Sequence, residues 1–277
     1  MIPFDFEYYR PSTISDAINL FNNLDNMGKQ PIYYGGGTEF ISMARMHNVY
    51  TQAVIDTKGI KELNICEIRD DELNIGAAVT LTQIAESNLF PLLSLTVKRI
   101  ADHTIQDKIT LGGNIAGTII YRESVLPLMV SDADIVIAGK DGLNRLPFKD
   151  VFDKRIKLNK GELICSVIIK KEYLSLPSLH VKRTKNEKID YPLITIAALK
   201  RDNQINIAFS GLCKYPFRSS KIEKILNKGI NKDKKIKKLV DSLNDSILED
   251  ISGSAEYKKF LLHTMLYEAL ENLEEAY

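Results

Sequence analysis

Tyr34-Gly35-Gly36-Gly37-Thr38-Glu39-Phe40 is the stretch that decides the fold of this chain, and a second glycine-rich stretch follows further along, Thr110-Leu111-Gly112-Gly113-Asn114-Ile115-Ala116-Gly117. We refer to them as the first and the second glycine run. Glycines in such runs let the backbone take positive φ angles and bring bare N–H groups close to a ligand. Each run also contains a hydroxyl or amide side chain. A single run is common in turns, but two of this kind predict one extended ligand held at both ends.

The composition is that of a globular protein. Of 277 residues, 44% are hydrophobic, which supports a substantial core and allows two domains. The formal net charge of +1 argues against nucleic acid as the main partner. No apolar stretch is long enough to span a membrane, and the opening Met1-Ile2-Pro3-Phe4-Asp5 lacks the basic and apolar regions of a signal peptide. We therefore expect a soluble, cytoplasmic protein without nucleic-acid or membrane partners.

The cysteines and histidines show no pattern of a metal or disulfide site. The cysteines are Cys66, Cys165 and Cys213, and the histidines are His47, His103, His180 and His263. Three cysteines far apart exclude a disulfide framework and disfavour an iron–sulfur cluster held by this chain alone, so we expect buried, reduced thiols. The histidines lack metal-ligand spacing.

The first glycine run lies inside a predicted βαβ unit. Residues 31–34 and 53–56 have the pattern of short strands, and a helix is predicted from about Thr38 to Met46. Such a unit should be right-handed with parallel strands. The run then lies where a strand ends and a helix begins, so that N–H groups and the helix dipole favour a phosphate. An earlier helix is predicted to begin at Thr13, with Asp16 as its capping partner.

The middle of the chain predicts an antiparallel α+β unit. A hairpin is expected to turn at Asp70-Asp71, between strands 65–68 and 72–75. Thr80 and Gln83 form a capping box for a helix. Further elements are a helix from Pro91 to Asp102, the second glycine run as a turn, a short helix or turn over 125–131, and a strand over 135–138.

The sequence from residue 163 onward predicts strands followed by helices. Strands are expected over 163–169, 179–183, 193–199 and 205–209, with a turn at Asp202-Asn203. From Ser220, with Glu223 as capping partner, the chain is expected to be helical to its end, apart from a break over 250–254. A domain boundary is expected near residues 170–175.

Neither glycine run matches a common nucleotide motif. Three consecutive glycines in the first run lack the G-x-G-x-x-G spacing of dinucleotide-binding folds, and no Gly-Lys-Ser/Thr follows as in a P-loop. A plain strand-to-helix turn is the alternative for that run. Glu39 is unexpected beside a phosphate, unless it accepts a hydroxyl hydrogen bond or caps the helix. The second run is the sharper signal, because Asn114 adds an amide that donates and accepts.

The two runs resemble the FAD-pyrophosphate loops of the FAD-binding subunits of molybdenum hydroxylases, the xanthine dehydrogenase and carbon monoxide dehydrogenase family. The family patterns are roughly A-G-G-T-D-L and T-I-G-G-N-I, and the flavin fold is that of the vanillyl-alcohol oxidase superfamily. The resemblance extends over nearly the whole chain. Further matching segments are residues 4–8 with Pro11, 54–56, 73–77 with Thr80, 126–128, 132–137 and 161–163, with Gly211 and Arg218.

The resemblance implies an α+β protein of two domains. Residues 1–172 would form an FAD-binding domain of the vanillyl-alcohol oxidase-like type, made of the small βαβ unit and the antiparallel α/β unit. Residues 173–277 would form a smaller C-terminal flavoprotein domain of antiparallel sheet and helices. The FAD is expected to be non-covalent, since no histidine lies in either glycine run.

The resemblance also implies the residues that contact FAD. The first run would wrap the pyrophosphate and ribityl region, the second run would form the opposite wall, and residues from elsewhere, with Ile100 near the adenine, would complete the site. The implied contacts are Tyr33, Tyr34, Gly35, Gly36, Gly37, Thr38, Glu39, Phe40, Ile100, Thr110, Gly113, Asn114, Ala116, Glu123, Ile164 and Lys182. For Lys182 the alternative is a solvated strand lysine, and for Ile100 and Ile164 it is core packing.

The function implied is that of an oxidoreductase subunit with no catalytic residue or metal ligand of its own. In the family, a large subunit oxidises substrate at a molybdenum cofactor, and electrons pass through [2Fe–2S] clusters in a small subunit to FAD and on to NAD+ or another acceptor. The expected partners are therefore the molybdenum-binding large subunit and the [2Fe–2S] small subunit. Two alternatives stay open: a freestanding flavin reductase of the same fold, and a non-redox assembly or sensory module that has lost FAD.

Two segments depart from the family pattern. Ile105-Gln106-Asp107-Lys108 stands where the family often has Gln-Ile-Arg-Asn. Ile119-Ile120-Tyr121-Arg122-Glu123 stands where the family has small residues and an Asp. Arg122 is left with three possible partners, Glu123, a phosphate or another protein.

Overall fold

The N-terminal unit is a parallel three-stranded sheet with two helices. The computed structural model describes residues 2–186, 190–243 and 246–275. The unit comprises β1 (Glu7–Tyr9), α1 (Ile14–Asn26), β2 (Ile32–Tyr34), α2 (Thr38–Arg45) and β3 (Ala53–Asp56). Both β1 and β2 pair in parallel with β3, in the order β1-β3-β2. The predicted βαβ unit is confirmed, and β1 is a third strand that its exposed, three-residue sequence does not predict.

Helix α1 forms because its apolar residues recur at helical spacing and its first turn is capped. The Thr13 side chain accepts a hydrogen bond of 3.1 Å from the Asp16 N–H, as predicted. Ala17, Ile18, Phe21 and Leu24 form the buried face. Together with β3 this face builds a small core beside the first glycine run.

The central unit is an antiparallel five-stranded sheet in the order β4-β5-β10-β6-β7. Its strands are β4 (Cys66–Arg69), β5 (Glu72–Gly76), β6 (Asp134–Gly139), β7 (Gly142–Pro147) and β10 (Leu163–Lys170), and a short helix η1 (Lys61–Asn64) precedes them. The hairpin that turns at Asp70 and Asp71 is confirmed, and both turn residues have positive φ angles. The antiparallel character predicted for this unit is therefore confirmed.

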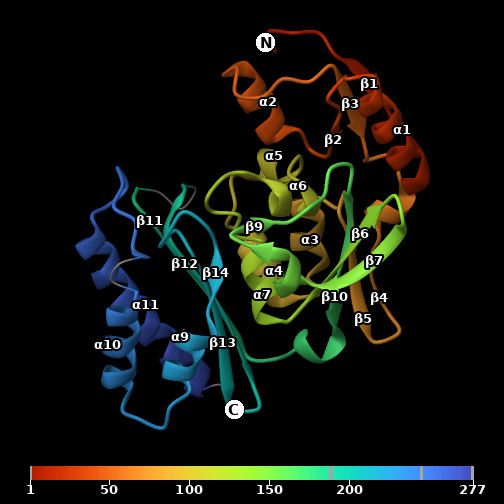
Figure 1. The fold of residues 1–277 in the computed structure, drawn as a ribbon. Coiled ribbons are helices and arrows are strands. Elements are labelled where there is room, and N and C mark those ends of the chain that lie inside the picture. Colours follow the sequence, from red (N-terminus) through yellow and green to blue (C-terminus); the bar gives the residue numbers. More distant parts are fainter. Residues whose placement is uncertain (1, 187–189, 244–245, 276–277) are drawn as a thin grey trace.

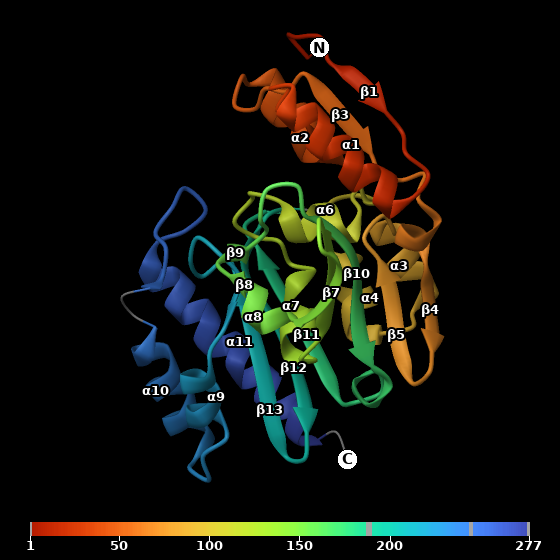
Figure 2. The same cartoon turned by 45° about the vertical axis from the view of Figure 1, so that its right-hand side comes forward.

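Short helices pack against the central sheet and form its core. They are α3 (Leu81–Ser87), α4 (Pro91–Val97), α5 (His103–Gln106), α6 (Leu111–Ala116), α7 (Val125–Val130) and α8 (Phe148–Val151), and a two-stranded ribbon, β8 (Phe152–Asp153) and β9 (Arg155–Ile156), follows α8. The capping box of α3 is present, with Thr80 and Gln83 bonded reciprocally. Figures 1 and 2 show α6 between the sheet and the N-terminal unit.

Two predictions about this unit are wrong. The helix expected from Pro91 to Asp102 ends at Val97, because Ala101 has a positive φ and the Asp102 side chain caps the separate helix α5. The second glycine run is not an open turn but the helix α6. Thr110 supplies the cap, since its hydroxyl accepts from the Gly113 N–H at 3.2 Å.

In its described residues, the C-terminal part is a four-stranded antiparallel sheet followed by three α-helices. Its elements are η2 (Lys171–Tyr173), β11 (Ser178–Thr184), β12 (Pro192–Arg201), β13 (Gln204–Ser210), β14 (Phe217–Arg218), α9 (Ser220–Leu226), α10 (Lys232–Ser242) and α11 (Ala255–Glu275). The helices cover one face of the sheet, while α4 and α7 of the central unit cover the other (Figures 1 and 2). Strand β12 is therefore buried on both faces: Ala197 joins the central core and Ile196 the C-terminal one.

The capping role predicted for Ser220 and Glu223 is wrong. The residue before α9 is Ser219, and no side chain caps this helix. Glu223 instead accepts hydrogen bonds from the Ile207 N–H at 3.0 Å and from Arg218 Nε at 2.6 Å, because β13 and β14 lie beside α9.

In the described part of the chain, no helix is long and apolar enough to cross a membrane.

Candidate functional site

The two glycine runs lie against each other. A Cβ atom on Gly35 would lie 2.6 Å from Thr110 Oγ1, and one on Gly36 would lie 1.5 Å from the carbonyl oxygen of Lys108. Side chains are therefore excluded at both positions by the approach of the second run. Gly37, with φ of 71°, occupies the N-cap of α2. The distant runs thus form one continuous site, as two loops gripping one ligand require.

The first run presents the unpaired backbone donors. Within the described ranges, the N–H groups of residues 35–40 donate to no protein acceptor, and no side chain caps α2. By contrast, the N–H groups of Leu111 and Gly112 donate to the carbonyls of Val79 and Ala77, both at 2.9 Å. The free donors at the amino end of α2 fit an anionic group such as a diphosphate. The second run provides a wall and not a second set of free donors.

Glu39 joins the first run to the end of the second. Its Oε1 accepts a hydrogen bond of 2.7 Å from the Thr118 N–H and another from the Thr118 hydroxyl. A Cβ on Gly117 would lie 2.7 Å from Glu39 Oε2, so this carboxylate is packed against the backbone there. Glu39 thus accepts a hydroxyl hydrogen bond, one of the two roles considered for it, and braces α2 across the site.

A second set of contacts, which the sequence does not reveal, holds the backbone of the first run in place. Lys58 Nζ donates to the carbonyl of Gly35 and to Asp56 Oδ1, both at 2.8 Å, and lies 4.6 Å from the centre of the Tyr34 ring. Tyr8 donates its hydroxyl to the other oxygen of Asp56. Burial disfavours ionisation of Asp56, but hydrogen bonds from Lys58 and Tyr8 outweigh burial and hold its pKa below the ordinary value. No motif marks Lys58, since its role depends on where β3 ends beside β2.

The aromatic residues of the first run point in different directions. Tyr33 stacks on Phe21 of α1, with ring centres 4.9 Å apart, and donates its hydroxyl to the Gly161 carbonyl at 2.9 Å. Burial raises the pKa of the Tyr33 hydroxyl. Tyr34 faces the opposite way, as alternation along β2 requires, and its ring meets Phe40 edge-on at 5.9 Å. Tyr34 therefore lines the loop, whereas Tyr33 supports it from the core.

In α6, Asn114 faces the segment that leads to α7. Its Oδ1 accepts a hydrogen bond of 2.5 Å from the Ser124 hydroxyl. Thr110 is buried and forms an isolated bridge with Thr80, while Ala116 lies exposed at the end of the helix. Ser124 thereby connects the second run to its neighbour, Glu123.

Glu123 and Lys182 form a buried ion pair. Lys182 Nζ lies 3.0 Å from Glu123 Oε2 and donates to the Arg99 carbonyl at 2.6 Å. Thr195, the partner of Lys182 in the β11–β12 register, donates its hydroxyl to Glu123 Oε1 at 2.6 Å. Burial raises the pKa of the Glu123 carboxyl against the opposing effect of Lys182. Lys182 is therefore not a solvated strand lysine. Thr195, Arg99 and Ser124 are partners that only the folded chain reveals.

Ile100 and Ile164 both pack on the central core. Ile100 is half-buried and follows Arg99, whose carbonyl binds Lys182, so it lies beside the ion pair. Ile164 is buried in β10, where the pairing with β6 shifts register before Ser166. The predicted site residues thus form two groups, the glycine runs and the surroundings of the Glu123–Lys182 pair, with Ser124 between them.

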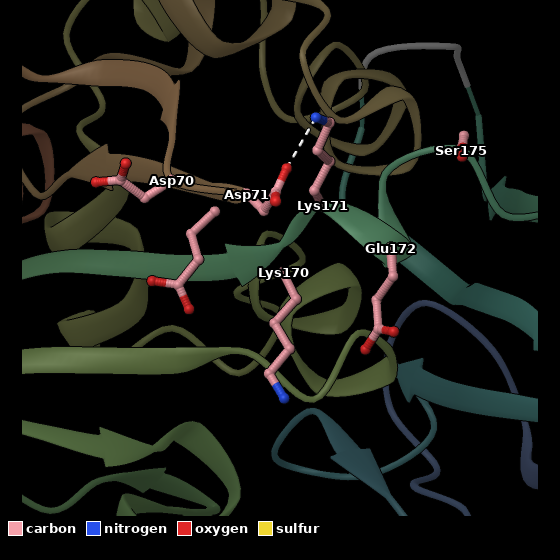
Figure 3. A pocket seen from close by; sticks show the side chains of 7 residues that line it. Asp70, Asp71, Lys170, Lys171, Glu172 and Ser175 are labelled. Atoms are coloured by element: carbon pink, nitrogen blue, oxygen red, sulfur yellow. Dashed lines mark hydrogen bonds and ion pairs between the residues drawn. The ribbon is translucent and has the colours of Figure 1, made fainter.

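Other concavities and polar clusters lie away from these groups. An open concavity of about 690 Å³ is lined by charged residues at the start of β5 and the end of β10 (Figure 3). Its charges are exposed and partly paired, as with Lys171 and Asp71 at 2.9 Å. The glycine runs meet the opposite end of β5, where Gly112 bonds Ala77. Among the described residues, no group of three or more His, Cys, Asp or Glu side chains is placed to hold a metal ion.

Three comparisons relate this chain to known proteins. Residues 4–171 match the family described as the FAD binding domain in molybdopterin dehydrogenase. The glyceraldehyde dehydrogenase medium chain of Sulfolobus acidocaldarius is 24% identical over 99% of this chain and 100% of its own length. The carbon monoxide dehydrogenase medium chain of Hydrogenophaga pseudoflava is 23% identical over 98% of this chain and 97% of its own.

Solved structures share the fold. A carbon monoxide dehydrogenase structure from Hydrogenophaga pseudoflava superposes with a TM-score of 0.87 at 22% identity, covering 99% of both chains. Quinoline 2-oxidoreductase from Pseudomonas putida 86 superposes with a TM-score of 0.86 at 18% identity, covering 100% of this chain and 99% of the other. The arrangement around the glycine runs is therefore a known fold. With its family match over residues 4–171, the chain belongs to the FAD-binding family of molybdopterin dehydrogenases, and so to the oxidoreductase subunits of the molybdenum hydroxylase class.

Proposed function

We propose that this chain is the FAD-binding electron-transfer subunit of a multisubunit molybdenum hydroxylase. The observation that carries the proposal is the row of unpaired N–H groups over residues 35–40, at the amino end of α2 and against the second run. Such a row fits the diphosphate of a dinucleotide, because backbone donors and the helix dipole both favour negative charge. Family membership specifies the dinucleotide as FAD.

Different residues of the site hold different parts of FAD. The first run binds the diphosphate through its backbone, while Glu39 and Lys58 keep that backbone in place. The second run supplies the facing wall through Thr110, Gly113, Asn114 and Ala116. The group of Ile100, Glu123, Ile164 and Lys182 lies beyond Ser124, where the far end of an extended cofactor would reach.

The chemistry supplied by bound FAD is the exchange of single electrons with iron–sulfur centres and of electron pairs with NAD+ or another acceptor. The chain's own part is to bind the cofactor non-covalently, orient it and shield it from water. We propose a large subunit with a molybdenum cofactor and a small subunit with [2Fe–2S] clusters as partners. The medium-chain relatives support this proposal by their names and by their near-complete coverage of the chain.

We also propose that the two domains meet at residues 172 and 173. The family match ends at residue 171, and the next sheet begins at Ser178. The C-terminal sheet nevertheless packs on α4 and α7, so the halves share a large apolar contact. Residues 173–277 then serve as a C-terminal domain that closes one side of the site.

The proposal is tested by purifying the chain and reconstituting it with FAD. We expect a yellow protein with about one FAD per chain, whose flavin is released into the supernatant on acid precipitation. We expect little reduction by NADH until the large and small subunits, co-expressed and co-purified, are added. Rapid NADH oxidation by the isolated chain would favour a freestanding reductase. A folded, colourless chain that takes up no FAD would refute the proposal.

A further inference from the structure

The two glycine runs contact each other at both ends of one face of α6. At the first end, a Cβ on Gly35 would lie 2.6 Å from Thr110 Oγ1. At the second end, a Cβ on Gly117 would lie 2.7 Å from Glu39 Oε2. Thr110 and Gly117 cap α6 at its two ends and are seven residues apart, which is about two helical turns. Both caps therefore lie on the side of α6 that faces the first run.

Gly113 occupies the middle of that face. It follows Thr110 by three residues and precedes Gly117 by four, so helical periodicity turns it toward the first run. Apart from its chain neighbours and its own helix backbone, the one described atom within 4 Å of an added Cβ is Thr110 Oγ1, at 2.9 Å. The N–H groups of residues 35–40 have no acceptor in the described part of the chain. The space between the two contacts is therefore where an anion would meet those donors.

The two contacts differ in how they can open. At the inner end, Thr110 is 2% exposed and Gly36 lies against the backbone carbonyl of Lys108, so packed main chain fixes this contact. At the outer end, Thr118 is exposed and a single long side chain makes the contact. Glu39 Oε1 accepts from the Thr118 N–H at 2.7 Å and from the Thr118 hydroxyl. Rotation of the Glu39 side chain is enough to open the outer end.

The charge of Glu39 does not favour binding of an anion. Its carboxylate lies in the first turn of α2, where it suits the helix dipole while the site is empty. A diphosphate bound to the same turn would be repelled by it. The hydrogen bonds to Thr118 give the carboxylate a different role, because a charged acceptor forms stronger hydrogen bonds than a neutral amide does.

We propose that Glu39 and Thr118 form a latch that closes the outer end of this space over the FAD diphosphate and sets the rate at which FAD enters and leaves. The inference rests on the proposed function. FAD has a ring system at each end and is narrower at its diphosphate, so it cannot slide lengthwise between two closed contacts. The latch must open for each exchange, but it adds little to affinity, because the same hydrogen bonds form without FAD.

The test measures FAD association and release by stopped-flow fluorescence, using the full-length apo chain and an apoflavoprotein trap for released FAD. The proteins are the wild type, Glu39→Gln and Thr118→Val. We expect association and release to accelerate together, by about tenfold in Glu39→Gln and about threefold in Thr118→Val, which keeps the N–H donor. In Glu39→Gln, the loss of support for α2 and the relief of repulsion oppose each other. The dissociation constant should therefore change by less than about threefold.

Lys58→Gln is the matched comparison, because Lys58 supports the same run through the Gly35 carbonyl without closing the outer end. It should accelerate release but not association. Glu86→Gln, which removes an exposed carboxylate on α3, should change neither rate. Faster release without faster association in Glu39→Gln would make Glu39 an ordinary binding contact and overturn the latch, and so would unchanged rates.

Thermal unfolding of the apo proteins shows whether each variant is folded. If Glu39→Gln does not fold, Thr118→Val decides the test, since it changes one exposed side chain outside the helices. A folded wild-type chain that binds no FAD would instead refute the proposed function itself.

Discussion

Lys182 Nζ lies 3.0 Å from Glu123 Oε2, and the two side chains are only 1% and 4% exposed. Lys182 belongs to β11 of the C-terminal sheet, and Glu123 lies between α6 and α7 of the central unit. The pair therefore joins the two parts of the chain at the segment that follows the second glycine run. Desolvation offsets much of the attraction between buried charges, so the pair contributes more to the placement of the sheet than to stability.

Removing one partner of this pair should destabilise the protein far more than removing both. Lys182→Met leaves a buried carboxylate unpaired and should reduce the free energy of unfolding by about 3–5 kcal/mol. Lys182→Met combined with Glu123→Leu removes both charges, and most of the loss should be recovered. Urea unfolding of the single and double variants at pH 7.5 measures this coupling. Strictly additive losses would contradict the ion pair.

The contact between the glycine runs should not tolerate a methyl group. Gly36→Ala would place a Cβ 1.5 Å from the Lys108 carbonyl, a backbone atom that cannot rotate away. We expect the first run to be displaced and FAD affinity to fall at least tenfold, with a loss of about 1–3 kcal/mol in folding stability. Gly229→Ala is the control, because no atom lies within 4 Å of its added Cβ. Flavin fluorescence quenching reports the affinities, and similar results for both variants would contradict the contact.

Lys58, which holds the backbone of the first run in place, should affect FAD affinity without contacting FAD itself. Lys58→Gln removes the hydrogen bond to the Gly35 carbonyl and the ion pair with Asp56. We expect about a 2- to 10-fold loss in FAD affinity, the size of one hydrogen bond. Lys61→Gln, an exposed lysine on η1, should leave the affinity unchanged. The same titration measures both, and a normal affinity in Lys58→Gln would show that the run holds its shape unaided.

His180 should make folding stability depend on pH below about 6.5. Burial, with Arg99 and Lys182 close by, lowers its pKa to about 3 from an ordinary 6.5, and its Nε2 has no hydrogen-bond partner in the described structure. The folded state therefore keeps His180 neutral, while the unfolded chain takes up a proton as the pH falls. This contribution is complete above pH 6.5 and is lost toward pH 3, at about 1.4 kcal/mol per pH unit.

His180→Gln should remove that part of the pH dependence. Urea unfolding of the wild type and the variant at pH 7.5 and pH 5.5 gives the comparison, since all other titrating groups are common to both. We expect the variant to lose about 1 kcal/mol less than wild type over this interval. Equal losses in the two proteins would show that His180 is protonated in the folded state.

Much of the fold follows from local patterns. The βαβ unit, the 70–71 hairpin and the caps at Thr13 and Thr80 are confirmed because the pattern of each element is contained in one short stretch of sequence. Strand β7 has no such pattern, since all of its residues are exposed. It forms because it pairs with β6 and because Arg145 bonds Glu72 and Asp134. These partners lie on other strands, so nothing within β7 predicts it.

The site, like the fold, has features that the local sequence predicts and others that depend on residues distant in sequence. Both runs can be found in the sequence by their glycines. Where two backbone segments approach closely, side chains do not fit, so the positions of close contact are occupied by glycine. No sequence motif identifies Lys58, Thr118 or Thr195, since each forms its hydrogen bond with a residue that is distant in sequence. Which donors are free is also invisible in the sequence: the N–H groups of Leu111 and Gly112 in the second run are bonded to Val79 and Ala77, whereas those of residues 35–40 have no protein acceptor in the described structure.

The sequence by itself determined the family and the two runs that meet at the site, because glycine patterns and strand and helix periodicity are local properties of the chain. Only the tertiary structure decided that Lys182 is buried against Glu123, and that Arg122 is buried with its guanidinium against Lys154 and Phe152. Pairing and burial of charges depend on which distant segments pack together. For that reason Lys182, ambiguous as a sequence position, has a specific and testable partner in the folded protein.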